Sequence, residues 1–234
     1  MVPEDALPTI RFAGRAWTVK TSGVPVGPGP NLFSADRVTV DPAGRLRLSI
    51  DAGRSGWNCA EVIAKEEPGQ REAVNDLDKL DQRSGVAFGY GTYRWRIVSD
   101  VHLLDRHAVL GMFLWSDDPS QAHRELDIEF ARWGEAAPPD QGLFTVQNLA
   151  EPRGFGFPAA PGRSEHTISW TPGRVTFRSR FGRVVHQWTP EGSRIPSPGS
   201  AVAPRINLWL FRGHAPSGPQ AVTIEDFSYV RLRP

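Results

Sequence analysis

Short runs of alternating hydrophobic and polar residues, separated by turn residues, extend along most of the chain. In Arg45–Ile50, charged or polar residues alternate with leucine and isoleucine, a pattern typical of a strand with one buried face. Turn sequences such as Asp41-Pro42-Ala43-Gly44 and Thr171-Pro172-Gly173 punctuate these runs. Further strands are expected at Val38–Asp41, Ala87–Val98, Val109–Trp115, Glu125–Phe130, Leu143–Leu149, His166–Trp170, Arg174–Phe181, Val184–Trp188, Ile206–Phe211 and Val222–Leu232.

No segment has a sustained helical period, so the chain is expected to be all-β, an antiparallel sandwich or barrel. Its 234 residues fit a single domain over 1–234, with no repeat or linker to divide it. Two stretches are expected to be long loops: the charged Glu66–Gly85, and the glycine- and proline-rich Glu151–Arg163.

Composition excludes several classes of function. The net charge is +1 without a basic block, which argues against a nucleic-acid partner. The longest apolar run, Val109–Trp115, is far too short to cross a bilayer, so no membrane association is expected. The single cysteine, Cys59, cannot form an internal disulfide. Residues Met1–Asp5 lack the features of a signal peptide, which leaves a cytoplasmic protein and a processed secreted one both open.

The segment Glu125-Leu126-Asp127-Ile128-Glu129-Phe130 carries the candidate chemistry. On a strand, successive side chains point to opposite faces, so three acids share one face and three hydrophobic residues the other. Like charges held this close raise at least one pKa, the condition under which a carboxylic acid keeps its proton near neutrality. Retaining glycosidases need this combination of an ionised nucleophile and a protonated acid.

Spacing supports this interpretation. The Cα atoms of Glu125 and Glu129 are expected roughly 13 Å apart, at about 3.3 Å per residue. Two long Glu side chains leaning inward can bring their carboxyls to the roughly 5 to 5.5 Å of retaining chemistry. The alternative is a solvated strand face whose acids pair with arginines, and an isolated motif of this length favours that alternative.

The flanking residues change this balance, because in order along the chain they resemble glycoside hydrolase family 16. The acidic segment matches the unbulged family signature of licheninases and xyloglucan enzymes. Matching segments are Asp41–Leu48, the early strand pair; Cys59-Ala60-Glu61, similar to a Cys-Gly-Glu stretch; Gly89–Tyr93, similar to a Tyr-Gly-x-Tyr strand; Ser169–Pro172; and Asn207-Leu208-Trp209.

The resemblance implies a role for each site residue. Glu125 would be the nucleophile, Glu129 the general acid/base and Asp127 the residue that tunes the nucleophile. The residues expected to bind substrate are Trp115, Arg96, Gln147, Asn148, Asn207 and Trp209. Trp115 and Trp209 could equally be core residues, and Arg96 could be a solvated strand residue. The histidines show no ligand spacing, so no metal is assigned to them.

The fold implied is a concanavalin A-like β-jelly-roll of two antiparallel sheets with a concave substrate cleft. The activity implied is that of a retaining endo-β-glucanase, which hydrolyses a β-1,3-1,4-glucan-like polysaccharide by double displacement. A transglycosylase and a non-catalytic glycan-binding sandwich remain alternatives. The resemblance also implies a polysaccharide or oligosaccharide partner, a monomer, secretion and no required cofactor. A structural calcium ion, as in licheninases, would involve backbone oxygens near Gly44 and Asp226.

Two departures from the family are visible. The strand that often reads Tyr-Glu-x-Arg is Tyr93-Arg94-Trp95-Arg96 here, with a base in place of an acid. The disulfide partner that licheninases provide for Cys59 falls near Asn31, so that bridge is absent.

Overall fold

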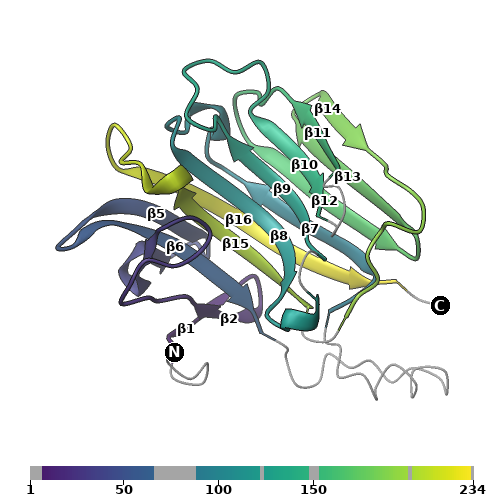
Figure 1. Cartoon of the computed structure of the whole chain (residues 1–234), viewed down its shortest axis with the longest axis horizontal. Coiled ribbons are helices and arrows are strands. Elements are labelled where there is room, and N and C mark those ends of the chain that lie inside the picture. Colours follow the sequence, from purple (N-terminus) through teal and green to yellow (C-terminus); the bar gives the residue numbers. More distant parts are fainter. Residues whose placement is uncertain (1–6, 66–87, 122–123, 148–152, 200–201, 233–234) are drawn as a thin grey trace.

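The computed structural model describes residues 7–65, 88–121, 124–147, 153–199 and 202–232, and over these the chain forms two layers of β-strands (Figure 1). The first layer, named the cleft sheet here, runs in the order β11-β10-β9-β8-β15-β6-β2-β1. Its strands are β1 (Thr9–Phe12), β2 (Arg15–Val19), β6 (Gly56–Ala64), β8 (Ala108–Ser116), β9 (Leu126–Ala131), β10 (Gly142–Val146), β11 (Arg153–Phe157) and β15 (Val202–Leu210).

The second layer, the outer sheet, runs in the order β5-β16-β7-β12-β13-β14, with β4 paired to β5. Its strands are β4 (Val38–Val40), β5 (Leu46–Gly53), β7 (Gly91–Ile97), β12 (Ser164–Thr171), β13 (Arg174–Phe181), β14 (Val184–Trp188) and β16 (Gln220–Arg231). The hairpin of β5 and β6 joins the two sheets. Pairing within both sheets is antiparallel, and the short β3 (Leu32–Phe33) runs parallel to β6.

Helical structure in the described residues is limited to four 3-10 turns: η2 (Ala35–Arg37), η4 (Val101–Leu103), η5 (Pro119–Gln121) and η6 (Phe211–Gly213). None of these helices is long and apolar enough to span a bilayer.

The core lies between the two sheets. Leu126, Ile128 and Phe130 of β9 are all buried there, as the alternation in the sequence requires. The Phe130 ring packs edge-on against His166 and Phe181 of the outer sheet, at centroid distances of 5.0 and 6.0 Å. One face of β9 is thereby fixed in the core, so its acidic residues must lie on the opposite face of the cleft sheet.

The expected all-β sandwich is confirmed, but the prediction of a loop over Glu151–Arg163 is wrong for Arg153–Phe157, which form β11. Glycine in this strand serves close packing rather than a turn. A Cβ on Gly156 would lie 2.6 Å from Asp140 Oδ2, and one on Gly142 of the paired strand would lie 2.2 Å from the Phe157 ring. The expected loop Glu66–Gly85 lies outside the described residues.

Candidate active site

A cavity of about 420 Å³ lies over the cleft sheet. It is lined by Lys20, Gly27, Pro28, Glu61, Gly111, Phe113, Trp115, Asp117, Glu125, Asp127, Glu129, Arg205, Asn207 and Trp209. The three predicted acids are therefore brought together in one cavity, on the face opposite the core. The strands β6, β15, β8 and β9 lie side by side and provide most of its floor.

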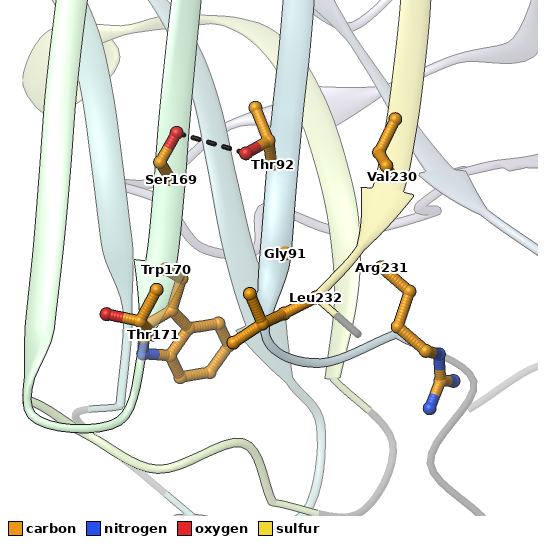
Figure 2. A pocket seen from close by; sticks show the side chains of 8 residues that line it. All are labelled: Gly91, Thr92, Ser169, Trp170, Thr171, Val230, Arg231 and Leu232. Carbon is orange, nitrogen blue, oxygen red and sulfur yellow. Dashed lines mark hydrogen bonds between the residues drawn. The ribbon is translucent and has the colours of Figure 1, made fainter. Parts of the chain in front are cut away.

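A second cavity, of about 210 Å³, lies on the outer sheet between β7, β12 and the end of β16 (Figure 2). Thr92 and Ser169 share a hydrogen bond at 3.1 Å on one side of it, and Arg231 points away from it in Figure 2. It has no carboxylate in its lining. The candidate chemistry therefore belongs to the cavity on the cleft sheet.

Strand register places the cavity residues in rows across the sheet. One row contains Glu129 on β9, Gly111 on β8, Asn207 on β15 and Glu61 on β6. Gly111 has no side chain, and the amide of Asn207 occupies the space above it, since a Cβ on Gly111 would lie 2.5 Å from Asn207 Oδ1. Between Glu129 and Asn207, the row therefore has only Gly111, which carries no side chain.

The neighbouring row contains Asp127 on β9, Phe113 on β8 and Arg205 on β15. Asp127 is 3% exposed, whereas Glu125 and Glu129 on either side of it are half-buried. Glu125 precedes the first residue of β9, but the ladder continues through it, because the Gln147 N–H donates to its carbonyl at 3.0 Å. The two flanking acids are thus more open to a ligand than the central one.

The environment shifts the pKa of all three carboxyls upward. Burial raises the pKa of Glu129 to about 7, and the charge of Glu125 adds to this shift. Burial, then the charges of Glu125 and Glu129, raise the pKa of Asp127 well above its usual range. The protonated form of Asp127 is therefore favoured, and in that form it can donate a hydrogen bond to Glu125.

Glu125 is the acid of the three that is best able to ionise. Burial raises its pKa, but a hydrogen bond from Asp127 and the positive charge of Arg205 oppose that shift. The charge of Glu61 acts in the direction of burial. Two carboxyls on one strand face thus differ in proton affinity, which is the usual sign of an acid and a nucleophile with separate roles.

Four charged residues in the cavity were not predicted as site residues. Glu61 is 1% exposed and lies between two cations, with Lys20 Nζ at 2.9 Å and Arg205 Nη1 at 3.3 Å. Arg205 also donates from Nη2 to Asp117. The resemblance of Cys59-Ala60-Glu61 to a family segment was a sequence signal for Glu61. No local sequence pattern indicates Lys20, Asp117 or Arg205.

Both predicted tryptophans line the cavity. Trp209 is only 9% exposed and packs edge-on against Trp133, with ring centroids 6.4 Å apart. Trp115 is half-buried, and its Nε1 donates to Asp117 at 3.2 Å. Trp209 is therefore both a core residue and a cavity residue, while Trp115 offers more of its surface to a ligand.

Asn31 takes the place that the resemblance gives to a disulfide partner of Cys59. The buried Cys59 Sγ donates to Asn31 Oδ1 at 3.4 Å. The Asn31 Nδ2 donates to the carbonyls of Pro28 and Leu210, at 2.7 and 2.9 Å. Hydrogen bonds thus attach the cavity-lining Pro28 segment to β15, next to Trp209.

Gln147, at the end of β10, is a further predicted residue that contacts the acids. The side chain of Gln147 hydrogen bonds with Asp127, which lowers the pKa of that acid and so offsets part of its increase. Asn148 lies outside the described residues.

The prediction that Arg96 belongs to the cleft is wrong. Arg96 is on β7 of the outer sheet, where Tyr93, Trp95 and Ile97 point into the core and Arg96 points outward. Its Nη2 donates to Asp226 Oδ2 of β16 at 2.6 Å. The core of the sandwich separates Arg96 from the cavity.

At the expected calcium position, the Asp226 side chain is not available as an additional ligand. The Asp226 carboxylate is engaged by the Arg96 guanidinium, a cation that opposes a second one at the same oxygen. Within the described part of the chain, no group of three or more His, Cys, Asp or Glu side chains could hold a metal ion.

Comparison with solved structures gives the fold an independent reference. The chain matches a β-glucanase of Bacillus licheniformis with a TM-score of 0.66, at 15% identity over 97% of each chain. It matches a glycoside hydrolase family 16 endo-glucanase of Bacteroides ovatus with a TM-score of 0.65, at 13% identity over 92% of this chain and 94% of that one. The chain has the fold of these glucanases.

A third match is a Mycobacterium tuberculosis protein described as an immunostimulatory antigen and pseudo β-1,3-glucanase. It has a TM-score of 0.65 and 16% identity, over 93% of this chain and 91% of that one. No protein-family model matches the sequence, and a search of curated proteins finds no significant match. The predicted jelly-roll fold is therefore confirmed by the similarity to solved structures.

Proposed function

We propose that this protein is a glycoside hydrolase of family 16. It cleaves internal linkages of a β-linked polysaccharide and retains the anomeric configuration. The observation that carries this proposal is the pair Glu125 and Glu129, on one face of one strand in a single cavity, with the pKa of Glu129 raised to about 7. A β-1,3-1,4-glucan-like polymer is the proposed substrate, in line with the fold shared with β-glucanases.

In the first step, the Glu125 carboxylate attacks the anomeric carbon and forms an ester bond to the sugar. The glycosidic C–O bond breaks, and Glu129 gives its proton to the departing oxygen. Burial disfavours the charge of Asp127, so its protonated form is favoured next to Glu125. Its hydrogen bond therefore helps to hold Glu125 as a carboxylate.

In the second step, Glu129 is a carboxylate and takes a proton from water. The water oxygen attacks the anomeric carbon, and Glu125 leaves as a carboxylate. A sugar hydroxyl in place of water would give transglycosylation with the same residues. Trp115 and Trp209 are proposed to bind sugar rings through their flat apolar faces, with Asn207 as a hydrogen-bonding partner.

The alternative of a non-catalytic glycan-binding sandwich gives no reason for three adjacent carboxyls with shifted proton affinities. An experiment separates the two: the chain and its Glu125→Ala variant are incubated with a panel of β-glucans, and the products are analysed. Cleavage by the unaltered chain alone supports the proposal. Binding without cleavage by both proteins would favour the non-catalytic alternative, and equal cleavage by both would contradict the role of Glu125. Polymeric products that are longer than the substrate would indicate transglycosylation.

A further inference from the structure

Arg205 is the one cavity-lining residue that joins several of the charged groups described above. It projects from β15 in the same row as Asp127, and only 6% of its surface is exposed. Its guanidinium donates to Glu61 at 3.3 Å and to Asp117. A side chain held at two points by carboxylates has little freedom to move.

The distribution of charge around Arg205 is uneven. Lys20 lies 2.9 Å from Glu61 and offsets the charge of that buried carboxylate. The side chain of Asp117 is 69% exposed, so water screens its charge. The positive charge of Arg205 is therefore only partly matched by its two partners. Arg205 and Glu125 line the same cavity, and the charge of Arg205 lowers the pKa of Glu125.

We propose that Arg205 is a positioning residue that holds Glu125 in its ionised form, with Glu61 and Asp117 as the clamp that fixes the guanidinium at the cavity wall. This role of Arg205 rests on the proposed function only where it is tested by enzyme kinetics, and the titration of Glu125 does not depend on it. Burial and the charge of Glu61 both favour protonated Glu125. Without a nearby cation, the nucleophile would therefore be neutral over a wider range of pH.

Other polar and charged groups line the cavity with Glu125. Asp127 favours ionised Glu125 by its hydrogen bond, and Gln147 at the end of β10 is uncharged. The charged or titratable side chains that line the cavity together with Glu125 are Asp127 and Glu129 of β9, Arg205 of β15, Glu61 of β6, Asp117 after β8, and Lys20 after β2. Arg205 and Lys20 are the two cations of this set. Lys20 donates to Oε2 of Glu61, whereas Arg205 donates to Oε1.

The test measures the pKa of Glu125 directly, by following the carboxyl carbon resonances of ¹³C-labelled glutamates during a pH titration. Glu125→Gln identifies the resonance by removing it. In Arg205→Gln, which loses the charge but keeps a side-chain amide to bond Glu61, the pKa of Glu125 should rise on the order of one unit. Arg205→Lys keeps the charge, and the pKa should stay within a few tenths of a unit of the wild-type value.

Arg96→Gln is the matched control, because Arg96 also pairs with a carboxylate but lies on the outer sheet. It should leave the pKa of Glu125 unchanged. An unchanged pKa of Glu125 in folded Arg205→Gln would overturn the proposal and leave Arg205 a structural residue. If Arg205→Gln does not fold, Arg205→Lys still decides: a rise on the order of one unit there would show that the charge does not act as proposed.

The kinetic readout uses a β-glucan oligosaccharide with an activated aryl leaving group. The acidic limb of kcat/KM reports ionisation of the nucleophile in the free enzyme, so it should move to higher pH in Arg205→Gln by the same amount as the pKa. If the wild-type chain cleaves no β-glucan, the proposed function fails. The titration of Glu125 still tests the role of Arg205 in that case.

Discussion

Gly111 on β8 and Asn207 on β15 face each other so closely that a methyl group on Gly111 would lie 2.5 Å from Asn207 Oδ1. Real side chains do not approach this closely, so the glycine is what allows the amide to lie over the cavity floor. The next nearest side chain, that of Phe113, would be 3.6 Å away and could stay in place.

Gly111→Ala is therefore expected to turn the Asn207 amide away from its position and to weaken glycan binding. Loss of one hydrogen bond to a sugar hydroxyl corresponds to an increase in KM of up to about tenfold. Gly23→Ala is the matched control, because a Cβ there meets nothing within 4 Å. Steady-state kinetics on a β-glucan measures the effect, and equal KM values for both variants would show that the amide does not bind substrate.

The two cavity tryptophans are expected to differ when each is replaced by alanine. Trp115→Ala should lower affinity for a glucan oligosaccharide by about 1 to 3 kcal/mol, by analogy with stacking on nucleic-acid bases, with little loss of stability. Trp209→Ala should lose affinity and also about 3 to 5 kcal/mol of unfolding free energy, because Trp209 is 9% exposed and packs on Trp133. Calorimetric titration and denaturant unfolding separate the two effects. Lost stability with unchanged affinity in Trp209→Ala would assign that residue to the core alone.

His166 should make the fold sensitive to acid. Burial lowers its pKa to about 3 in the folded protein, where both ring nitrogens bond to the hydroxyls of Ser164 and Ser179 at 2.8 Å. The unfolded chain takes up the proton near the ordinary value of about 6.5. The stabilisation is thus complete above that value and is lost as pH falls towards 3, with a slope approaching about 1.4 kcal/mol per pH unit.

His166→Gln keeps a polar group between the two serines but does not titrate. Unfolding free energies measured between pH 4 and 7 should therefore change less steeply with pH in this variant than in the wild-type chain. Identical slopes would show that other groups cause the acid sensitivity.

The raised pKa of Glu129 predicts the basic limb of activity. Because the general acid must be protonated, kcat/KM on a β-glucan should fall above the pKa of about 7. Glu129→Ala should lose this activity but still react with an aryl glycoside whose leaving group needs no proton. Added azide should then replace water and give a glycosyl azide of retained configuration. Failure of azide to form this product, with polysaccharide cleavage intact, would remove Glu129 from the acid/base role.

The sequence predicts β9 and its acidic face well, because local alternation alone decides which side chains of Glu125–Phe130 meet the core. It does not predict β6, whose residues are mostly buried on both faces and so do not alternate. The contacts of Arg205 with Glu61 and Asp117 join positions that are 144 and 88 residues apart. No local pattern carries such contacts, since they depend on the order of strands in the sheet.

Arg96 is a second case in which the sequence predicts the face of a strand but not the position of that strand in the fold. The alternation of Tyr93-Arg94-Trp95-Arg96 indicates correctly that Arg96 points away from the core. It does not indicate that β7 belongs to the outer sheet, and this placement is what separates Arg96 from the acids.

The central claim is that Glu125 attacks the sugar and that the product keeps its anomeric configuration. The most direct measurement is ¹H NMR of the anomeric signals during the first minutes of β-glucan hydrolysis, before mutarotation mixes the anomers. The account predicts that the β-anomer appears first and that Glu125→Ala forms no product. A first-formed α-anomer, or near-normal hydrolysis by Glu125→Ala, would contradict it.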